Sequence, residues 1–105
     1  MVEIGVNINN REPLLTEKYP VAEMLDIAER SEDLGYDSVW VGDSLLEKPR
    51  FDPVAVLSNV AARTDTVDLG TACMITALRN PIQLAQQWAT LDVLSGGRTT
   101  LGACM

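Results

Sequence analysis

The apolar residues along the chain follow two alternating periods, and this alternation predicts a repeating β–α architecture. Short β-prone runs are expected over residues 3–8, 38–41, 67–71 (extending to 75) and 98–103. Between these runs, apolar residues recur every three or four positions, which is typical of amphipathic helices. The strands are evenly spaced with one helix between each pair, so the crossovers imply parallel strands.

Local residues predict where these helices begin and end. Gly35 stands where a left-handed cap would end the first helix, and Gly96 and Gly97 end the third. Asp52 and Asn80 each precede a proline, which is the pattern of a polar cap followed by the first helical residue. The predicted buried faces consist of Val21, Met24, Leu25 and Ala28, then Val54, Leu57 and Val60 or Ala61, and finally Leu84, Ala85, Trp88 and Leu91.

Two architectures fit this pattern. A doubly wound sheet could be nearly complete at 105 residues, whereas a (β/α)8 barrel takes about 250 residues and would be only half present. The sequence stops within or directly after the predicted fourth strand, and no helix follows to cover that strand. We interpret residues 1–105 as one incomplete domain, the N-terminal half of an α/β barrel with about four strands and three helices.

The charge balance excludes several function classes. Eight Lys and Arg against 15 Asp and Glu give a net charge of −7, which disfavours binding to nucleic-acid phosphates or to anionic lipid. No apolar run reaches the length of a membrane span, and the first residues do not resemble a secretory signal, so we expect a cytoplasmic protein without membrane or nucleic-acid partners.

The absence of histidine limits the chemistry further. Without it, the chain cannot form a Ser–His or Cys–His nucleophile pair or a zinc site with histidine ligands, and we expect no metal. Cys73 and Cys104 form no CxxC motif, and we predict two reduced, buried thiols. Met24, Met74, Trp40 and Trp88 are interpreted as packing residues.

Ligands of parallel α/β proteins bind at the carboxyl ends of the strands, which directs attention to four short segments. They contain Asn9 and Asn10, residues 42–44, residues 72–76 and residues 102–105. Asp43 could face a ligand as an acceptor or base, or could bond its own backbone in an Asx-turn. Ser44 could likewise cap a turn or contact a ligand. Residues 70–74 fit either a bulge that approaches a flat ligand or a plain buried strand.

Three sequence blocks resemble the N-terminal region of the bacterial luciferase-like family. They are GYDSVWVGDS, AARTDTVDLGTACMITALRNP and LAQQWATLDVLSGGR, the last followed closely by LG, and the resemblance extends over nearly the whole chain. That family includes flavin-dependent monooxygenases and oxidoreductases that use the deazaflavin coenzyme F420. The resemblance implies a TIM barrel whose carboxyl end binds a reduced flavin or deazaflavin, with FMN and F420 left as alternatives.

The resemblance also implies site residues. Family members commonly have a bulge, sometimes with a non-proline cis peptide, behind the cofactor ring at the end of the third strand, and this maps to Ala72, Cys73 and Met74. The family's acidic residue after the second strand maps to Asp43, so we expect Asp43, Ser44, Ala72, Cys73 and Met74 to bind the cofactor, while catalytic residues stay unassigned.

Two departures from the family pattern change the expectation. Many deazaflavin enzymes have histidine where this chain has Ser44, which argues against alcohol dehydrogenation. The portion of the family fold after the fourth strand is missing, so we expect no turnover from this chain alone.

The sequence therefore predicts part of a flavin- or deazaflavin-dependent oxidoreductase that acts on a small organic substrate and forms a homo-oligomer. It does not separate a monooxygenase from a reductase. The alternative is a non-catalytic α/β module that self-associates through exposed sheet edges. A phosphoacceptor domain is disfavoured, because Asn9 and Asn10 stand where that class needs acidic residues.

Overall fold

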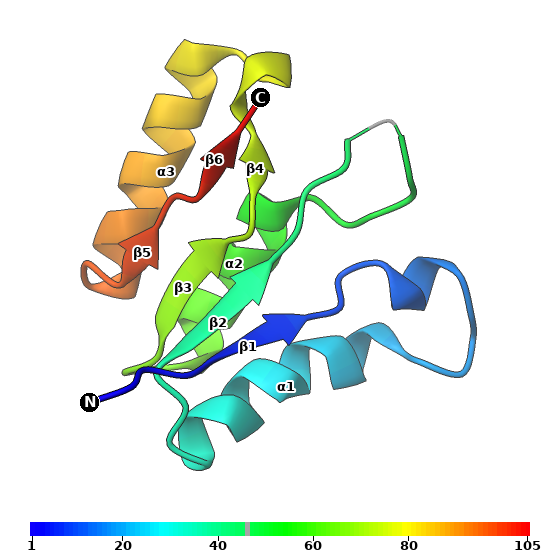
Figure 1. The fold of residues 1–105 in the computed structure, drawn as a ribbon, viewed down its shortest axis with the longest axis vertical. Coiled ribbons are helices and arrows are strands. Elements are labelled where there is room, and N and C mark those ends of the chain that lie inside the picture. Colours follow the sequence, from blue (N-terminus) through cyan, green and yellow to red (C-terminus); the bar gives the residue numbers. More distant parts are fainter. Residues whose placement is uncertain (46) are drawn as a thin grey trace.

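The computed structural model describes residues 1–45 and 47–105, and it contains the predicted succession of strands and helices (Figure 1). The predicted loop over residues 44–51 includes Leu46, which lies outside the described residues. One parallel sheet has four strands in chain order, and a second has two. The first consists of β1 (Gly5–Ile8), β2 (Ser38–Val41), β3 (Asp68–Thr71) and β5 (Thr99–Thr100), and the second of β4 (Met74–Ile75) and β6 (Ala103–Cys104).

Three α-helices connect the strands, namely α1 (Val21–Asp33), α2 (Pro53–Arg63) and α3 (Pro81–Ser95). Two short 3-10 helices, η1 (Glu12–Leu14) and η2 (Thr76–Leu78), lie in the segments that follow β1 and β4. Within residues 1–45 and 47–105, no helix combines the length and the hydrophobicity needed to cross a bilayer.

The strand order decides between the two architectures. Because β1, β2, β3 and β5 follow one another in chain order, right-handed crossovers place every helix on the same face of the sheet. A doubly wound sheet instead reverses its strand order and carries helices on both faces. Figure 1 shows α1, α2 and α3 in succession beside the sheet, with α2 in contact with both of the others. This is the winding of a barrel wall.

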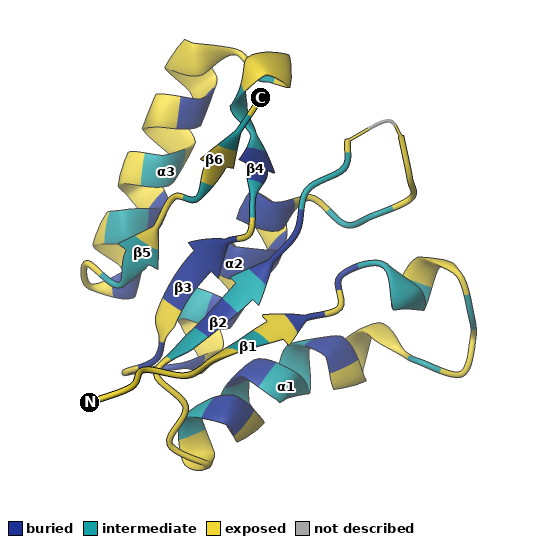
Figure 2. Ribbon diagram, in the orientation of Figure 1, coloured by how far each residue is buried: buried dark blue, intermediate teal, exposed yellow. Residues whose placement is uncertain are grey.

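The core lies between the helices and the face of the sheet that they cover (Figure 2). Val39 and Val41 alternate along β2 with the half-buried Ser38 and Trp40, as expected for a strand with one covered face. The main cluster of buried side chains is Ile8, Met24, Ala28, Val39, Val41, Val56, Leu57, Val60, Val67, Leu69 and Leu91.

Two residues of the predicted inner faces are exposed. Val21 is 45% exposed at the start of α1 and lies outside the core cluster. Ala85 is exposed because it follows the buried Leu84 and is therefore rotated by about 100° around the helix. The covered stripe of α3 continues through the half-buried Trp88 to Leu91.

The predicted helix boundaries are confirmed by their hydrogen bonds. The carboxylate of Asp52 accepts a bond from Ala55 N at 2.9 Å, and the amide oxygen of Asn80 accepts bonds from Ile82 N and Gln83 N at 3.0 and 3.2 Å. Gly96 follows α3 with φ of 75°, a conformation that favours glycine.

Arg98 connects the end of α2 to the start of β5. Its guanidinium donates to the carbonyl oxygens of Ala61 at 3.3 Å, Thr64 at 2.9 Å and Val67 at 2.6 Å. A cation at this position satisfies carbonyl groups that have no partner within the helix and interacts favourably with the helix dipole.

The third strand ends at Thr71, the shorter of its two expected extents, and a separate β4 follows the break. The fourth strand, expected to be continuous over residues 98–103, is divided into β5 and β6, which corrects that expectation. At the division, the hydroxyl of Thr71 donates to Gly102 O at 2.9 Å and accepts from Gly102 N at 3.1 Å. A side chain thus takes the place of a backbone partner, and the ladder resumes when Met74 N donates to Gly102 O at 2.7 Å. A side chain at Gly102 would overlap the backbone of Thr71, so glycine is required here.

Glu32 joins the last turn of α1 to the start of β3. Its carboxylate accepts hydrogen bonds from the backbone N–H groups of Asp65, Thr66 and Val67 and from the Thr66 hydroxyl. Burial by itself would raise the pKa of Glu32, but these four donors favour the charged form more strongly and lower the pKa to about 2.

We predict that Glu32→Gln lowers the free energy of unfolding at pH 7 by about 1–2 kcal/mol, a value reduced for solvent screening. Because the folded pKa lies below the usual 4.5, the charged form stabilises the fold above about pH 4.5, and this contribution disappears as the pH falls towards 2. Urea unfolding of both proteins between pH 7 and pH 2.5 measures the difference, with Asp33→Asn at the neighbouring exposed carboxylate as control. A difference that stays constant over this range would contradict the assignment.

Candidate functional site

The carboxyl ends of the strands meet at one edge of the structure, and every predicted site residue lies at this edge. Asp43 and Ser44 follow β2, while Ala72 and Cys73 separate β3 from β4. Asp43 reaches the third segment directly, since its carboxylate accepts a hydrogen bond from the backbone N–H of Ile75 at 3.0 Å. The fold therefore brings together segments that are more than 30 residues apart in the sequence.

Of the two alternatives for residues 70–74, the break between β3 and β4 supports the bulge and not a plain buried strand. The peptide bond between Ala72 and Cys73 is cis, at the position where the family resemblance implied such a bond. Ala72 is exposed, whereas the side chain of Met74 is fully buried between α2 and α3, in contact with Val54, Leu84 and Trp88. A ligand at this edge can therefore contact Ala72 and the backbone, but it cannot contact the Met74 side chain.

The carboxylate of Asp43 is engaged within the protein. The side chain is 3% exposed, and Oδ2 accepts bonds from Arg79 Nη2 at 2.9 Å and Nε at 3.3 Å in addition to the bond from Ile75 N. Oδ1 accepts a bond from Leu45 N at 3.3 Å, which is the Asx-turn that the sequence left open as an alternative. Asp43 thus positions the end of β4 through Ile75, and its contact with a ligand stays a prediction.

Arg79 connects this aspartate to α2. Its Nη1 donates to Asp52 Oδ1 at 3.0 Å, while the other oxygen of Asp52 caps the helix. Burial would lower the pKa of Arg79, but the hydrogen bonds to Asp43 and Asp52 and their negative charges outweigh burial and raise it. The guanidinium therefore holds a permanent charge opposite two carboxylates.

A second polar network joins the ends of β1 and β2. Asn10 is fully buried, and its amide donates to Gly42 O and Phe51 O, both at 2.9 Å. Arg50 donates to Asn10 Oδ1 at 2.9 Å and to Ser44 Oγ at 3.2 Å, and the Ser44 hydroxyl donates to Lys48 O at 3.0 Å. Ser44 therefore has the turn-capping role, and its hydroxyl oxygen also accepts a bond from Arg50.

Trp40 covers the side of the sheet that faces away from the helices. Its indole N–H donates to Ser38 Oγ at 2.8 Å, and a side chain at either Gly5 or Gly70 would collide with the ring. The indole therefore extends across three neighbouring strands, just before the segment that contains Asp43. The sequence predicts a packing residue here, which is confirmed, but it does not predict which face the ring covers.

Sequence reasoning missed Arg50 and Arg79 as members of this edge. Arg79 stands directly before the Asn80–Pro81 cap, and Arg50 lies in a loop after a lysine–proline pair, so neither has a periodicity or motif that points to a site. Their only signal is positive charge in a strongly acidic chain, which is too general to identify a partner.

The prediction of two reduced, buried cysteines is wrong. Cys73 and Cys104 are half-buried and form a disulfide, with Cα atoms 5.9 Å apart. The prediction relied on their separation of 31 residues in the sequence, but the parallel pairing of β4 with β6 places the two side chains next to each other.

Within the described ranges, no group of three or more Asp, Glu or Cys residues is arranged to hold a metal ion.

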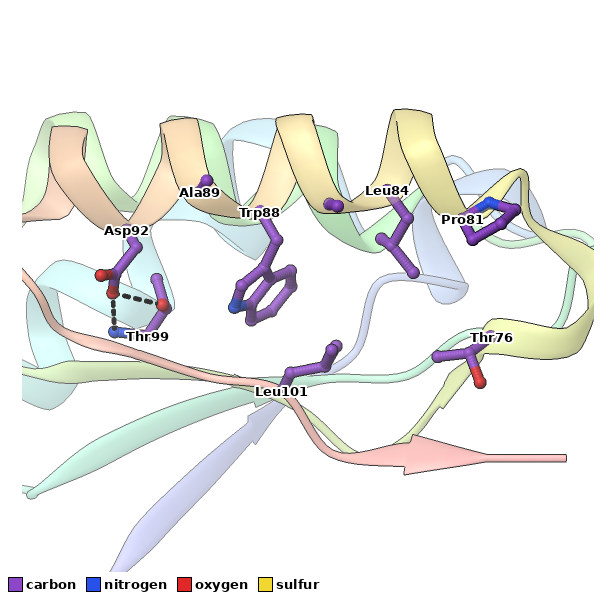
Figure 3. Close-up of a pocket in the computed structure, with 9 residues that line it drawn as sticks. Thr76, Pro81, Leu84, Trp88, Ala89, Asp92, Thr99 and Leu101 are labelled. Atoms are coloured by element: carbon purple, nitrogen blue, oxygen red, sulfur yellow. Dashed lines mark hydrogen bonds between the residues drawn. The ribbon is translucent and has the colours of Figure 1, made fainter.

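A groove of about 600 Å³ lies apart from the predicted site residues, between α3 and the segment that contains β5 (Figure 3). Leu84 and Trp88 face Leu101 across it, and Asp92 accepts hydrogen bonds from the hydroxyl and the N–H of Thr99 at one end. The residues that line the groove do not include Asp43, Ser44, Ala72, Cys73 or Met74.

Comparison with known proteins identifies the family. The model of the luciferase-like monooxygenase family matches residues 2–104. The chain belongs to this family. Curated relatives include the F420-dependent glucose-6-phosphate dehydrogenase of Kineococcus radiotolerans, which is 39% identical over 92 residues, corresponding to 82% of this chain and 27% of that protein.

Solved structures of luciferase-like enzymes confirm the half-barrel fold. The F420-dependent tetrahydromethanopterin reductase from Methanopyrus kandleri is 25% identical, with a TM-score of 0.78 over 97% of this chain and 26% of that one. The oxygenating constituent of 3,6-diketocamphane monooxygenase from Pseudomonas putida, in complex with FMN, has a TM-score of 0.84 over 99% of this chain and 29% of that one. At 17% identity, the second likeness shows the fold alone.

This chain therefore spans less than a third of the length of each of these luciferase-like proteins. The expected family and its enzymatic character are confirmed. Two of these proteins are F420-dependent, and F420 is one of the two cofactors between which the sequence left the choice open; the third structure contains FMN, the other one.

We predict that Arg79→Gln costs about 3 kcal/mol of folding free energy, because it leaves the carboxylate of Asp43 buried without its cation. The double variant Asp43→Asn/Arg79→Gln should recover about 2 kcal/mol of this loss, since no unpaired charge is then buried. Urea unfolding measures both changes. Arg63→Gln removes a surface pair of similar length, 3.1 Å to Asp26, and should cost less than about 1 kcal/mol. Equal costs for Arg63→Gln and Arg79→Gln would contradict this prediction.

Proposed function

We propose that these residues form the cofactor-binding N-terminal half of a (β/α)8-barrel oxidoreductase that uses coenzyme F420. Support comes from the bulge at Ala72–Cys73, which lies at the carboxyl edge beside β2, where the family resemblance implies the ring of the cofactor. The choice of F420 over FMN is supported by curated relatives above 35% identity that are F420-dependent dehydrogenases. We place this activity in the cytoplasm, as the sequence predicts.

The proposed roles of the five predicted cofactor-binding residues differ. Ala72 is exposed and Cys73 half-exposed, so these two offer atoms and backbone for contact with a flat ring. The side chains of Asp43 and Met74 are buried, so we assign them positioning roles: Asp43 holds the N–H of Ile75, and Met74 anchors the bulge in the core. Ser44 lies at the same edge, where its hydroxyl is oriented by Arg50.

The bound cofactor would supply hydride transfer to or from a carbon atom of a small organic substrate. The residues of this chain contribute binding and orientation, and Trp40 covers the sheet below the edge against water. Ser44 cannot accept a proton as a histidine would, so we do not propose alcohol dehydrogenation by this residue. We propose that the remaining phosphate and substrate contacts belong to the rest of the barrel and that this chain alone does not turn over.

The position of the ring can be tested with a matched pair of exposed alanines. Ala72→Leu places a larger side chain at the bulge and should weaken F420 binding at least about tenfold, because overlap with the ring removes its contact area. Ala85→Leu adds the same atoms on α3, at the groove that lies apart from the predicted site residues, and should leave the affinity unchanged. Fluorescence titration of the protein and both variants with F420, and then with FMN, measures the dissociation constants.

The results separate the alternatives. Tighter binding of FMN than of F420 would favour a flavin-dependent monooxygenase instead. Equal effects of Ala72→Leu and Ala85→Leu would show that the bulge does not face the cofactor. Absence of binding by both cofactors would contradict the proposal that this segment carries the cofactor-binding face.

We also propose self-association as a second property of this chain. β1 and β5 are the outer strands of the four-stranded sheet, and an outer strand offers unpaired backbone groups to a further strand. We expect a species of about twice the 11.4 kDa chain mass in light scattering after size-exclusion chromatography, increasing with concentration. A constant monomer mass over a hundredfold concentration range would contradict this expectation.

A further inference from the structure

The two cysteines of the chain are brought together at the proposed cofactor-binding edge, although the function proposed above assigns no role to their sulfur chemistry. Cys73 follows Ala72 in the bulge, and Cys104 belongs to β6. The disulfide between them therefore joins the bulge covalently to the neighbouring strand. Both residues are half-buried, so a small thiol or disulfide can reach them.

The backbone pairing between these two segments is short, although side-chain hydrogen bonds of Thr71 and Thr76 also join them. β4 and β6 pair over only two residues each, and the pairing continues through the bond from Met74 N to Gly102 O. Strands this short are marginally stable by themselves, because few hydrogen bonds oppose the entropy of the free chain. A covalent link at this position therefore adds to the hydrogen bonds that order the bulge.

The structure accommodates the reduced form as well. Cys104 Sγ lies 3.5 Å from Met74 O, so a thiol at this position has a hydrogen-bond acceptor within reach. The oxidised and reduced forms thus fit the same strand register. They differ in whether the bulge is covalently linked to β6 or joined to that segment by hydrogen bonds alone.

We propose that Cys73 and Cys104 form a reversible thiol–disulfide switch that sets the order of the bulge and, through it, the affinity for the cofactor. The second part of this inference rests on the proposed function. Oxidation requires a low-molecular-weight disulfide: one cysteine thiolate attacks it and releases one small thiol, and the other cysteine thiolate then displaces the second. Two cysteine thiols lose two electrons and two protons, and the small disulfide is reduced to two thiols.

Glutathione buffers of defined reduced-to-oxidised ratio test the chemistry in the full chain. We expect alkylation followed by mass spectrometry to find two modified cysteines under reducing conditions and none under oxidising conditions, with full reversal when the ratio is reversed. A stable glutathione adduct on either cysteine, or oxidation that does not reverse, would overturn the switch.

Amide hydrogen exchange tests the effect on the bulge without any cofactor. Reduction should accelerate exchange at Met74 and Ile75 at least about tenfold, while Val39 in the core of the large sheet stays unchanged. Cys104→Ser should exchange at the fast rate under both conditions, because it cannot form the link. Equal rates at Met74 in the oxidised and reduced protein would overturn the proposed control of the bulge.

Titration with F420 in both redox states tests the link to function. The oxidised form should bind at least about fivefold more tightly, because its bulge is ordered before the ligand arrives. Equal affinities would overturn the control of binding. A third outcome is that neither form binds F420 while exchange at Met74 still responds to reduction. The proposed function and the coupling to cofactor affinity would then both be overturned, whereas the redox switch of the bulge would be supported.

Discussion

Pairing of the parallel strands in chain order is the constraint on which the rest of this structure depends. Since each crossover is right-handed, the three helices must cover the same face of the sheet, and the opposite face is left to Trp40 and the glycines beneath it. The same pairing aligns the carboxyl ends of the strands at one edge. The bulge at Ala72, which follows β3, therefore lies beside Asp43 and Ser44, which follow β2.

At this edge the regular ladder of backbone hydrogen bonds stops, and side chains supply the partners that the backbone needs. Thr71 bonds both polar groups of Gly102, Asp43 accepts the N–H of Ile75, and Asn10 bonds the carbonyls of Gly42 and Phe51. Each of these side chains is positioned by packing or by an arginine. An edge stabilised in this way leaves backbone atoms of the bulge accessible, which suits the binding of a flat cofactor.

Helix positions and caps could be predicted from the sequence because they depend on neighbours within four residues. Asp52, Asn80 and Gly96 act on their own helices, and the covered stripes follow from the helical period. The location of the candidate site followed from one general rule about parallel strands. Arg50 and Arg79 could not be predicted as members of the site, since their partners are Asn10 and Asp43, 40 and 36 residues away. The orientation of Trp40 could not be predicted either, because the alternation of residues along a strand does not show which side the helices will cover.

The sequence by itself determined the α/β class, the order of the elements and the family, since these depend on periodicity, on local capping and on blocks of residues that are continuous in the chain. Only the tertiary structure decided where the third and fourth predicted strands break, which partners the carboxylate of Asp43 has, and that Cys73 pairs with Cys104. These features arise from contacts between distant segments, and the geometry of such contacts is set by strand register and packing, which no local pattern encodes.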